Sequence, residues 1–384
     1  MELFYDKYTT KDETMYRLPM KVNIKEFWPE ELRYRMEKAH SLPLHSYDGH
    51  KYFYNATEEY INAADVITEM ARNASDTSVF AELTHGSIAE EAFYSSVIEG
   101  AYTTREKAHA LIDSQREPID KDERMILNNY KALQFVLDNL DSPVSHELIL
   151  RIGEMLTDGT LEEGVTAGYR DDIVYVKSRF GEIIYTAPPA DCVRPMMDQL
   201  IAYMNDKHVH PIEKAVVSHV YFVTIHPFFD GNGRTARALT YMILLKSGYD
   251  FFRLVPISGI LAEKRGQYYK ALQASQDREN GCDYTYFVNF YTELLAETLE
   301  SVKKRIAAMD KYRRVKEKLN PDSEGRLIKG ACWLATEDIE SITTEKWRKK
   351  FAVSFETARK DLNTLEEKGF LKKRTEGRKA FFDI

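Results

Sequence analysis

Apolar residues recur every three or four positions along most of the chain, the spacing that one face of an α-helix produces. The clearest case is TEEYINAADVITEMA within residues 56–73, and the same spacing continues over residues 78–114. Later runs of this kind include PIEKAVVSHVYFVTI, GRTARALTYMILLKSG and YTYFVNFYTELLAETLESVKKRIAAM. The pattern predicts a mainly α fold.

One segment breaks the helical pattern. The stretch DIVYVKSRFGEIIYTAPP, residues 172–189, alternates β-branched and aromatic residues around an Arg179-Phe180-Gly181 turn. Such alternation is typical of paired strands, so a β-hairpin is expected to stand out from the helical body. Its strand residues are Val174, Tyr175, Val176, Ile183, Ile184 and Tyr185.

The length of 384 residues exceeds the ~250–300 residues at which single cores stop growing, so more than one folding unit is expected. KLNPDSEG, residues 318–325, is polar, contains Pro and Gly, and is the best candidate for a linker. The expected parts are an N-terminal region, a central helical core, a helix with the linker, and a C-terminal domain, over residues 1–115, 116–300, 301–325 and 326–384.

The C-terminal part has a pattern of its own. A short helix from residue 344, a turn at Ala352-Val353 and a helix capped by Ser354 predict a helix-turn-helix. FLKKRTEGRKAFFDI follows as two strands about a Glu376-Gly377 turn, which would form the wing. A small winged-helix (α+β) domain is therefore expected.

Composition adds broad limits. Hydrophobic residues make up 43% and charged residues 30%, as in an ordinary globular protein. The net charge of -8 disfavours binding of the whole molecule to nucleic acid or anionic membrane, but not a local basic face. Cys192, Cys282 and Cys332 lie far apart, which suggests neither disulfides nor a zinc cluster. With no apolar leader or membrane-length apolar run, a cytoplasmic protein without membrane contact is expected.

The densest chemistry lies in HPFFDGNGRTAR, residues 226–237. The helix before it should end at His226, because Pro227 lacks an amide donor and disfavours helical geometry in the preceding residue. A second helix should begin near Gly233 or Arg234. The connection then exposes backbone N–H groups at a helix N-terminus, which form a ready site for a phosphate.

The side chains of this stretch fit a polyphosphate. Arg234 and Arg237 are three residues apart and share a helix face, and each guanidinium can pair with two phosphate oxygens. Asp230 could bridge a Mg²⁺ ion to the phosphates. His226, with an unperturbed pKa of about 6.5, could accept a proton at neutral pH. Each feature alone is usually structural, but at this spacing they indicate one site.

The run closely resembles the signature of the Fic family, H-P-F-x-D-G-N-G-R-x-x-R, and meets every specified position. The similarity extends over roughly residues 75–300. The resemblance implies a Fic-type helical bundle with a β-hairpin flap. It also implies transfer of AMP from ATP to a hydroxyl side chain of a protein, with release of pyrophosphate.

The resemblance further implies a role for each motif residue. His226 would deprotonate the target Ser, Thr or Tyr hydroxyl, which attacks the α-phosphate, and Asp230 would hold Mg²⁺. Phe228 looks like an apolar peg that fixes the loop. The implied nucleotide-binding residues are Gly231, Asn232, Gly233, Arg234 and Arg237.

A second family pattern lies upstream. SSVIEG contains Ser95, Glu99 and Gly100 in the inhibitory arrangement S/T-x-x-x-E-G/N, on a helix expected at about residues 85–100. Glu99 would pair with Arg237 and take the donors that the γ-phosphate would otherwise use. Because S-x-x-x-E is common on helices, the pattern indicates inhibition only in a chain that also contains the H-P-F-x-D-G-N-G-R-x-x-R signature.

Two further assignments follow from the resemblance. The hairpin resembles the flap that aligns the target segment by main-chain pairing, although a hairpin that merely covers the core is the alternative. Downstream, YYKAL places Tyr269 and Leu272 where similar proteins contact adenine, and both could equally be core residues.

The C-terminal end is basic, with twelve Lys or Arg against seven Asp or Glu from residue 341 onward. Cations on the second helix and wing could contact DNA phosphates. Protein contact or dimerisation is the alternative, since acidic residues dilute the basic face. The cations are Arg359, Lys360, Lys372, Lys373 and Arg374, and the acids are Glu356, Asp361, Glu366 and Glu367.

The sequence favours an autoinhibited protein adenylyltransferase that uses ATP with Mg²⁺. A DNA-binding regulator whose Fic-like site senses nucleotide is the alternative from another class, and the base His226 argues against it. Removal of AMP, with Glu99 positioning a water, would instead require Glu99 for activity. The target protein, the signal that displaces Glu99 and the oligomeric state, a homodimer included, stay open.

Overall fold

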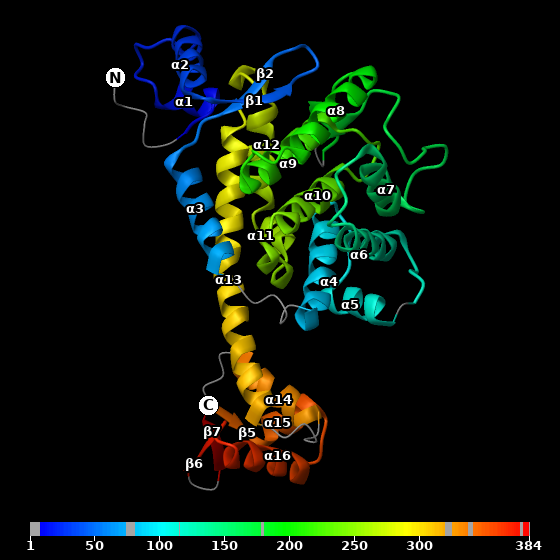
Figure 1. The fold of residues 1–384 in the computed structure, drawn as a ribbon, viewed down its shortest axis with the longest axis vertical. Helices are drawn as coiled ribbons and strands as arrows, with labels where there is room; N and C mark the ends of the chain where they lie inside the picture. Colours follow the sequence, from blue (N-terminus) through cyan, green and yellow to red (C-terminus); the bar gives the residue numbers. More distant parts are fainter. Residues whose placement is uncertain are drawn as a thin grey trace. The chain divides into compact units, whose positions relative to one another are not determined.

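The computed structural model describes residues 8–73, 81–114, 116–177, 180–318, 325–336, 341–376 and 379–383. The chain forms two compact units, Met1–Leu299 and Glu300–Ile384 (Figure 1). The first is mainly α with two small hairpins, and the second is a small α+β unit, which confirms the predicted fold class. The boundary lies inside α13 (Thr285–Lys318), whereas the expected division after residue 115 stays a prediction.

The first unit consists mainly of α-helices. Its α-helices before α13 are α1 (Lys11–Arg17), α2 (Ile24–Lys38), α3 (Glu58–Asn73), α4 (Ala81–Ile98), α5 (Arg105–Ser114), α6 (Lys121–Asp138), α7 (His146–Thr157), α8 (Ala190–Asn205), α9 (Pro211–Ile225), α10 (Asn232–Lys246), α11 (Ile257–Glu263) and α12 (Arg265–Gln276). Two 3₁₀ turns are η1 (Asp250–Leu254) and η2 (Arg278–Asn280). The hairpins pair β1 (His40–His45) with β2 (Lys51–Tyr54), and β3 (Tyr175–Lys177) with β4 (Ile183–Thr186).

The centre of the first unit is the pair α9 and α10, which pack along each other (Figure 1). Nearly every residue of both helices is buried. Helices α4, α6 and α7 pack against α10. Because the core surrounds this pair, the loop between the two helices has a fixed position.

The α9–α10 loop forms as its glycine and proline residues predict. His226 caps α9 with left-handed backbone angles, φ 51° and ψ 58°, and its N–H donates to the Phe222 carbonyl over 2.9 Å. Gly231 has φ 84°, a left-handed conformation that favours glycine, and α10 begins at the next residue. The helix end at His226 is confirmed, and α10 begins one residue before the expected start.

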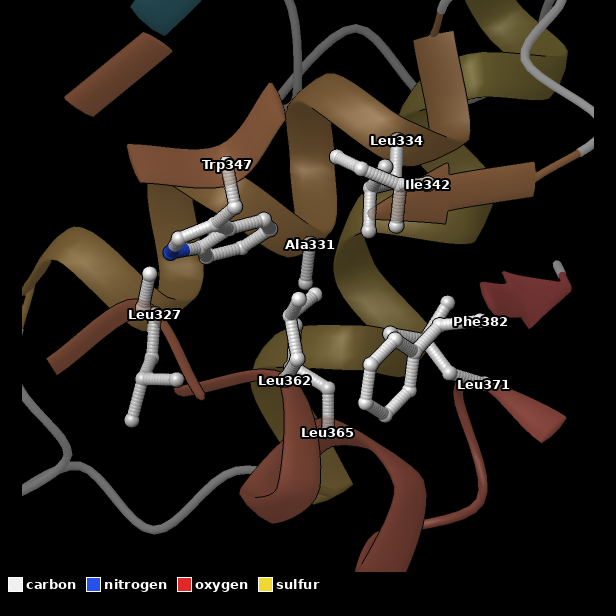
Figure 2. Close-up of a cluster of buried hydrophobic side chains, with 10 residues drawn as sticks. Leu327, Ala331, Leu334, Ile342, Trp347, Leu362, Leu365, Leu371 and Phe382 are labelled. Carbon is white, nitrogen blue, oxygen red and sulfur yellow. The ribbon is translucent and has the colours of Figure 1, made fainter. Parts of the chain in front are cut away.

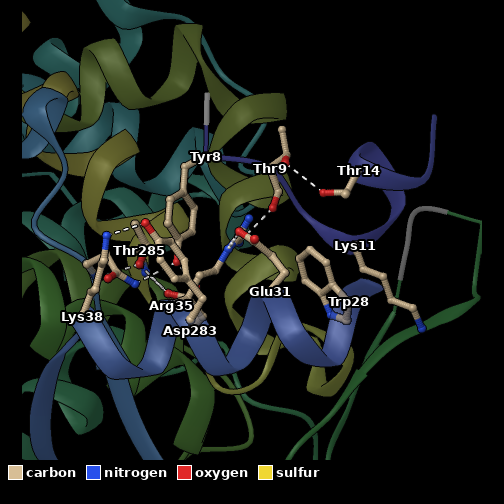
Figure 3. Close-up of polar contacts among 12 residues, drawn as sticks. Tyr8, Thr9, Lys11, Thr14, Trp28, Glu31, Arg35, Lys38, Asp283 and Thr285 are labelled. Atoms are coloured by element: carbon tan, nitrogen blue, oxygen red, sulfur yellow. Dashed lines mark hydrogen bonds and ion pairs between the residues drawn. The ribbon is translucent and has the colours of Figure 1, made fainter. Parts of the chain in front are cut away.

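Residues 8–38, the N-terminal arm, attach to the segment around residue 283 (Figure 3). The Tyr8 hydroxyl donates to the buried Asp283 carboxylate, and the Arg35 guanidinium lies 4.1 Å from the centre of the Tyr8 ring. Arg35 Nη1 donates to the Thr9 carbonyl over 3.0 Å, and Trp28 Nε1 donates to the Glu279 carbonyl over 2.6 Å. The arm is thus a packed part of the first unit, which no periodicity in residues 1–55 predicted.

The predicted hairpin is confirmed, although its strands are shorter than the alternation suggested. Tyr175 pairs with Thr186 and Val176 with Tyr185, and the register shifts before Lys177. Val174 precedes β3, and its carbonyl accepts from Ala187 N over 3.0 Å. Arg179 of the expected turn lies outside the described residues.

The second unit has its own apolar core (Figure 2). Trp347, Leu362 and Phe382 are fully buried there, and each comes from a different element. Residues 319–324 of the expected linker, and Gly377 of the wing turn, lie outside the described part. The elements after α13 are α14 (Gly325–Thr336), α15 (Thr344–Phe351), α16 (Phe355–Glu367) and a three-stranded sheet, in the order β5 (Ser341–Thr343), β7 (Lys379–Asp383), β6 (Lys372–Glu376).

Two sequence expectations concern what the fold lacks. Across the described ranges, none of the helices is both long and apolar enough to cross a bilayer. Cys192 and Cys282 carry free thiols.

Candidate functional site

His226 ends α9 with its ring at a cavity wall. Its Nδ1 lies 3.3 Å from the Val223 carbonyl oxygen. Because that oxygen can only accept, Nδ1 carries the proton and Nε2 keeps a lone pair. Burial lowers the pKa of His226 to about 4, although the side chain retains some exposure. The imidazole is therefore neutral at pH 7 and can accept a proton.

Asn232 holds the α9–α10 loop in shape. Its Oδ1 accepts from Phe228 N over 2.9 Å, and its Nδ2 donates to the Phe228 carbonyl over 2.8 Å. Both functions of the buried amide are used within the loop. Any contact of Asn232 with a ligand would therefore come from its backbone N–H, which lies in the first turn of α10.

Asp230 and Arg234 contact each other at the start of α10, where Asp230 is exposed and Arg234 is buried. The Asp230 side chain is 46% exposed, and its Oδ1 accepts from Gly231 N over 2.6 Å and from Arg234 Nη2 over 3.2 Å. Arg234 is buried, and its Nη1 donates to the Leu156 carbonyl over 2.8 Å. Arg234 thus supports the loop from the protein side, while Oδ2 of Asp230 stays open for a cation.

Arg237 lies one turn further along α10 and contacts α4. Its Nε donates to Ser95 Oγ over 2.8 Å, and its Nη2 donates to the Ser95 carbonyl over 2.9 Å and to Glu99 Oε1 over 2.8 Å. The guanidinium is buried, and Nη1 has no hydrogen-bond partner among the described residues. Glu99 raises the pKa of Arg237 against the effect of burial, so the pair is an ion pair.

The Glu99 carboxylate also lies against the first turn of α10. A Cβ atom on Gly233 would overlap Glu99 Oε1, so only glycine allows this approach. The N-terminus of a helix carries a partial positive charge and attracts anions. The described structure therefore already holds one anion at the first turn of α10. This anion is the carboxylate of Glu99, whose side chain is 30% exposed.

Adjacent buried carboxylates fix α4 in place. Glu91 accepts from Ser258 N over 2.8 Å, and burial raises its pKa. Glu90 Oε1 accepts from Arg105 Nε and His109 Nε2, each over 2.5 Å. These contacts join α4 to α11 and α5, so Glu99 is held at the end of an anchored helix.

A cavity of about 840 Å³ is lined by some of the predicted site residues. Tyr269 lies on its wall and donates from its hydroxyl to the Ile98 carbonyl over 3.3 Å, beside Glu99. Leu272 also lines the cavity but is largely buried. The predicted residues in the lining come from the residues that directly follow α4 and α9, from α10, from α12 and from the hairpin: Glu99, His226, Gly233, Tyr269, Leu272, Val176, Ile184 and Tyr185.

Other predicted residues lie outside this lining, among them the motif residues Asp230, Gly231, Asn232, Arg234 and Arg237. Tyr175 and Ile183 are exposed on the hairpin, and Val174 precedes its first strand. Ser95 is buried behind Arg237, and Gly100 follows the end of α4. Of the six predicted strand residues, Val176, Ile184 and Tyr185 therefore line the cavity.

Comparison with known families agrees with this geometry. Residues 143–244 match the Fic/DOC family, and residues 337–382 match the DeoR-like helix-turn-helix domain. The chain contains a Fic domain. The C-terminal match confirms the predicted winged helix, and the Fic resemblance stated from the sequence is confirmed over residues 143–244.

Solved Fic structures share the fold. A Fic family protein from Desulfovibrio desulfuricans G20 aligns with a TM-score of 0.60 and 20% identity, over 86% of this chain and 97% of that one. Fic-1 (aa134–508) from Caenorhabditis elegans aligns with a TM-score of 0.52 and 23% identity, over 66% of this chain and 72% of that one.

Curated relatives match only around the Fic domain. Protein adenylyltransferase Fic of Drosophila erecta is 33% identical over 108 residues, which cover 27% of this chain and 20% of that protein. Protein adenylyltransferase fic-1 of Caenorhabditis elegans is 33% identical over 94 residues, 24% of this chain and 17% of that protein. The matched segment thus spans a fifth or less of these relatives' lengths.

Arg170 is a residue of the Fic domain that sequence reasoning missed. Its buried guanidinium donates to the His226 carbonyl over 2.8 Å and to the Ile225 carbonyl over 3.3 Å. It also donates to the carbonyls of Asp172, over 2.8 Å, and Pro188, over 2.6 Å, at the two ends of the hairpin. One side chain therefore fixes the hairpin relative to the backbone of the α9–α10 loop.

One acidic residue of the winged helix does not lie where the sequence predicted. Asp361, expected on the basic face, is buried, and it accepts from Arg326 Nε over 2.9 Å and from Trp347 Nε1 over 3.0 Å. Arg359 and Lys360 are exposed on the same helix, and neither forms an ion pair with a described residue. The exposed face of α16 is therefore more basic than the sequence suggested.

Replacing Arg170 with Met should loosen the hairpin, because four carbonyls lose a donor and two of these hydrogen bonds, those to Pro188 and Ile225, are buried. An unsatisfied buried polar group costs ~1–3 kcal/mol, so a total loss of roughly 2–4 kcal/mol is expected after partial solvation. The free energy of unfolding should fall by this amount, and hydrogen exchange at the Ala187 amide should accelerate.

Arg194→Met is the matched control, because Arg194 is exposed on α8 and lies 3.8 Å from Asp198. It should change stability by under about 0.5 kcal/mol. Equal effects of the two substitutions would show that Arg170 does not hold the hairpin.

Proposed function

We propose that the Fic domain transfers AMP from ATP to a hydroxyl side chain of a protein and that Glu99 restrains this transfer. The observation that carries the proposal is one cavity lined by a neutral base, His226, by Gly233 at a helix N-terminus and by the Glu99 carboxylate, which pairs with the buried Arg237 guanidinium behind it. The adenylyltransferase names of the curated relatives support the reaction class.

His226 would act on the incoming alcohol. Its Nε2 accepts the hydroxyl proton while the oxygen forms a bond to the α-phosphorus. The bond from that phosphorus to the β-phosphate bridging oxygen breaks, and pyrophosphate leaves with the electron pair. The Arg170 contact to the His226 carbonyl keeps the ring at the cavity wall during this step.

The phosphates would lie at the first turn of α10. The N–H groups of this turn and the unpartnered Arg237 Nη1 supply donors at the proposed site. Asp230, exposed and with one free oxygen, would hold Mg²⁺, which offsets phosphate charge. Within the described residues no cluster of three metal-ligating side chains occurs, so phosphate and water would complete the coordination.

Glu99 restrains the reaction by competing for the same donors. A carboxylate and a terminal phosphate cannot both occupy the space between Gly233 and Arg237. A hundredfold suppression requires only ~2.7 kcal/mol, which one or two charge-assisted hydrogen bonds can supply. ATP bound beside Glu99 would be displaced from the in-line geometry.

Glu99→Gly should raise AMP transfer, self-modification included, by roughly a hundredfold, an increase equivalent to ~2.7 kcal/mol. His226→Ala should abolish it. The measurement is labelling of proteins in a cell extract with ATP labelled at the α- or the γ-phosphate. Label retained only from the α position identifies AMP transfer.

Glu117→Gly serves as the control, because Glu117 is an exposed carboxylate remote from the cavity lining. It should leave labelling unchanged. Equal labelling by wild type and Glu99→Gly would show that Glu99 does not restrain AMP transfer. Loss of activity in Glu99→Gly would instead favour AMP removal.

The pH profile should reflect the lowered pKa of His226. Because burial disfavours the charged imidazole, the base stays neutral from pH 7 down to about pH 5. In Glu99→Gly, kcat/KM should stay flat over this interval and fall near pH 4. An unperturbed histidine, with a pKa of ~6.5, would lose about nine tenths of the rate at pH 5.5, and such a profile would contradict the assignment.

We also propose that the winged helix contacts DNA phosphates, because Arg359 and Lys360 stand unpaired on the exposed face of α16. Arg359→Ala/Lys360→Ala should weaken binding of the full chain to duplex DNA and lower the salt slope by about 2. Lys131→Ala/Arg151→Ala, in the first unit, is the charge-matched control. Protein contact is indicated if wild type shows no salt-sensitive gel shift.

A further inference from the structure

A second groove adjoins the cavity that contains His226. Its volume is about 820 Å³, and it lies within the first unit. Ile184 and Tyr185 of β4, and Gln273 and Gln276 of α12, line both the groove and the cavity. A chain that passes β4 on leaving His226 would therefore enter this groove.

We propose that this groove binds a basic segment of the acceptor protein next to the residue that receives AMP. The proposal rests on the proposed function of the Fic domain and adds a determinant of acceptor choice. It places that determinant on the N-terminal arm, outside the segment that matches the Fic family.

The outer wall of the groove is α1 of the N-terminal arm, which contributes Thr10, Asp12, Glu13 and Tyr16. Two contacts with the rest of the first unit keep α1 in place. Lys11 N donates to Asn280 Oδ1 over 3.1 Å, and Glu13 pairs with Lys270 over 2.7 Å. Since Lys270 and Gln273 lie on α12, the wall is tied to the helix that also borders the His226 cavity.

The charges of the groove favour a cationic occupant. Its own cations are neutralised, since Lys270 pairs with Glu13 and Arg278 with Asp48. Asp12 and Asp277 are exposed and form no ion pair with any described residue. The acceptor would therefore meet uncompensated carboxylates on both walls.

Aromatic faces add a second preference for Lys or Arg. Tyr16 is 84% exposed and Tyr47 49% exposed, and both line the groove. The Arg278 guanidinium already lies 4.9 Å from the Tyr47 ring centre, so this wall accepts a cation over its ring.

The remaining lining argues for a peptide. It is rich in hydroxyl, amide and charged side chains, including Thr10, Thr186, Gln273 and Asn280. Pockets for small molecules are mostly apolar with few polar groups. Extended peptide backbones instead need many hydrogen-bonding partners, which such a lining supplies.

The test uses the full chain carrying Glu99→Gly, with α-labelled ATP in a cell extract. Adding Asp12→Lys and Asp277→Asn should reduce labelling of the main acceptor proteins at least tenfold, while the affinity for ATP stays unchanged. Asn at 277 retains an oxygen that can accept from Glu279 N, as Asp277 Oδ1 does over 2.9 Å.

The matched control adds Glu37→Lys and Glu117→Gln, which change the net charge equally at exposed sites outside the groove. It should label the same proteins as Glu99→Gly alone. Equal labelling by the groove and control variants would overturn the groove assignment while leaving AMP transfer intact. No labelled protein with Glu99→Gly itself would instead reject the proposed function. A loss confined to self-labelling would assign the groove to a second copy of the chain and also overturn the proposal.

Discussion

The rest of the site depends on the contacts that the buried guanidinium of Arg237 makes with α4 and Glu99. It is too deeply buried to be left without acceptors, so it pairs with the hydroxyl, carbonyl and carboxylate that α4 offers. Burial also makes it a strong ligand for any anion that reaches α10. The same donors therefore serve both the resting state and the proposed nucleotide complex, and the proposed restraint on activity follows from this shared use.

Around this contact the backbone is already set. Asn232 closes the α9–α10 loop, and Arg170 ties the hairpin to the His226 backbone. A site built this way needs little rearrangement before reaction, which is how positioning contributes to phosphoryl-type transfer. In the account proposed above, displacement of Glu99 is the main change required. The anchors Glu90 and Glu91 explain why α4 holds Glu99 there in the absence of a signal.

The sequence could predict what lies within one contiguous segment. The motif from His226 to Arg237 and the hairpin are local patterns, and the helix end at Pro227 follows from backbone chemistry. The contacts of Arg170 and the hydrogen bond between Tyr8 and Asp283 join residues that are far apart in the sequence. No periodic pattern in the sequence therefore indicates them. Asp361 was expected to be exposed because charged residues usually lie at the surface. It is buried because Arg326 and Trp347 donate hydrogen bonds to its carboxylate. The Glu99–Arg237 pair, 138 residues apart, could be expected only through the family resemblance.

The most direct test is a crystal structure of Glu99→Gly with Mg²⁺ and a non-hydrolysable ATP analogue. The account predicts the triphosphate at the first turn of α10, with Arg237 donating to a terminal phosphate oxygen and the α-phosphorus facing Nε2 of His226. The account would be contradicted if no nucleotide were bound at the first turn of α10 at saturating concentration. It would also be contradicted if the nucleotide were bound elsewhere while Arg237 kept only its Ser95 contacts.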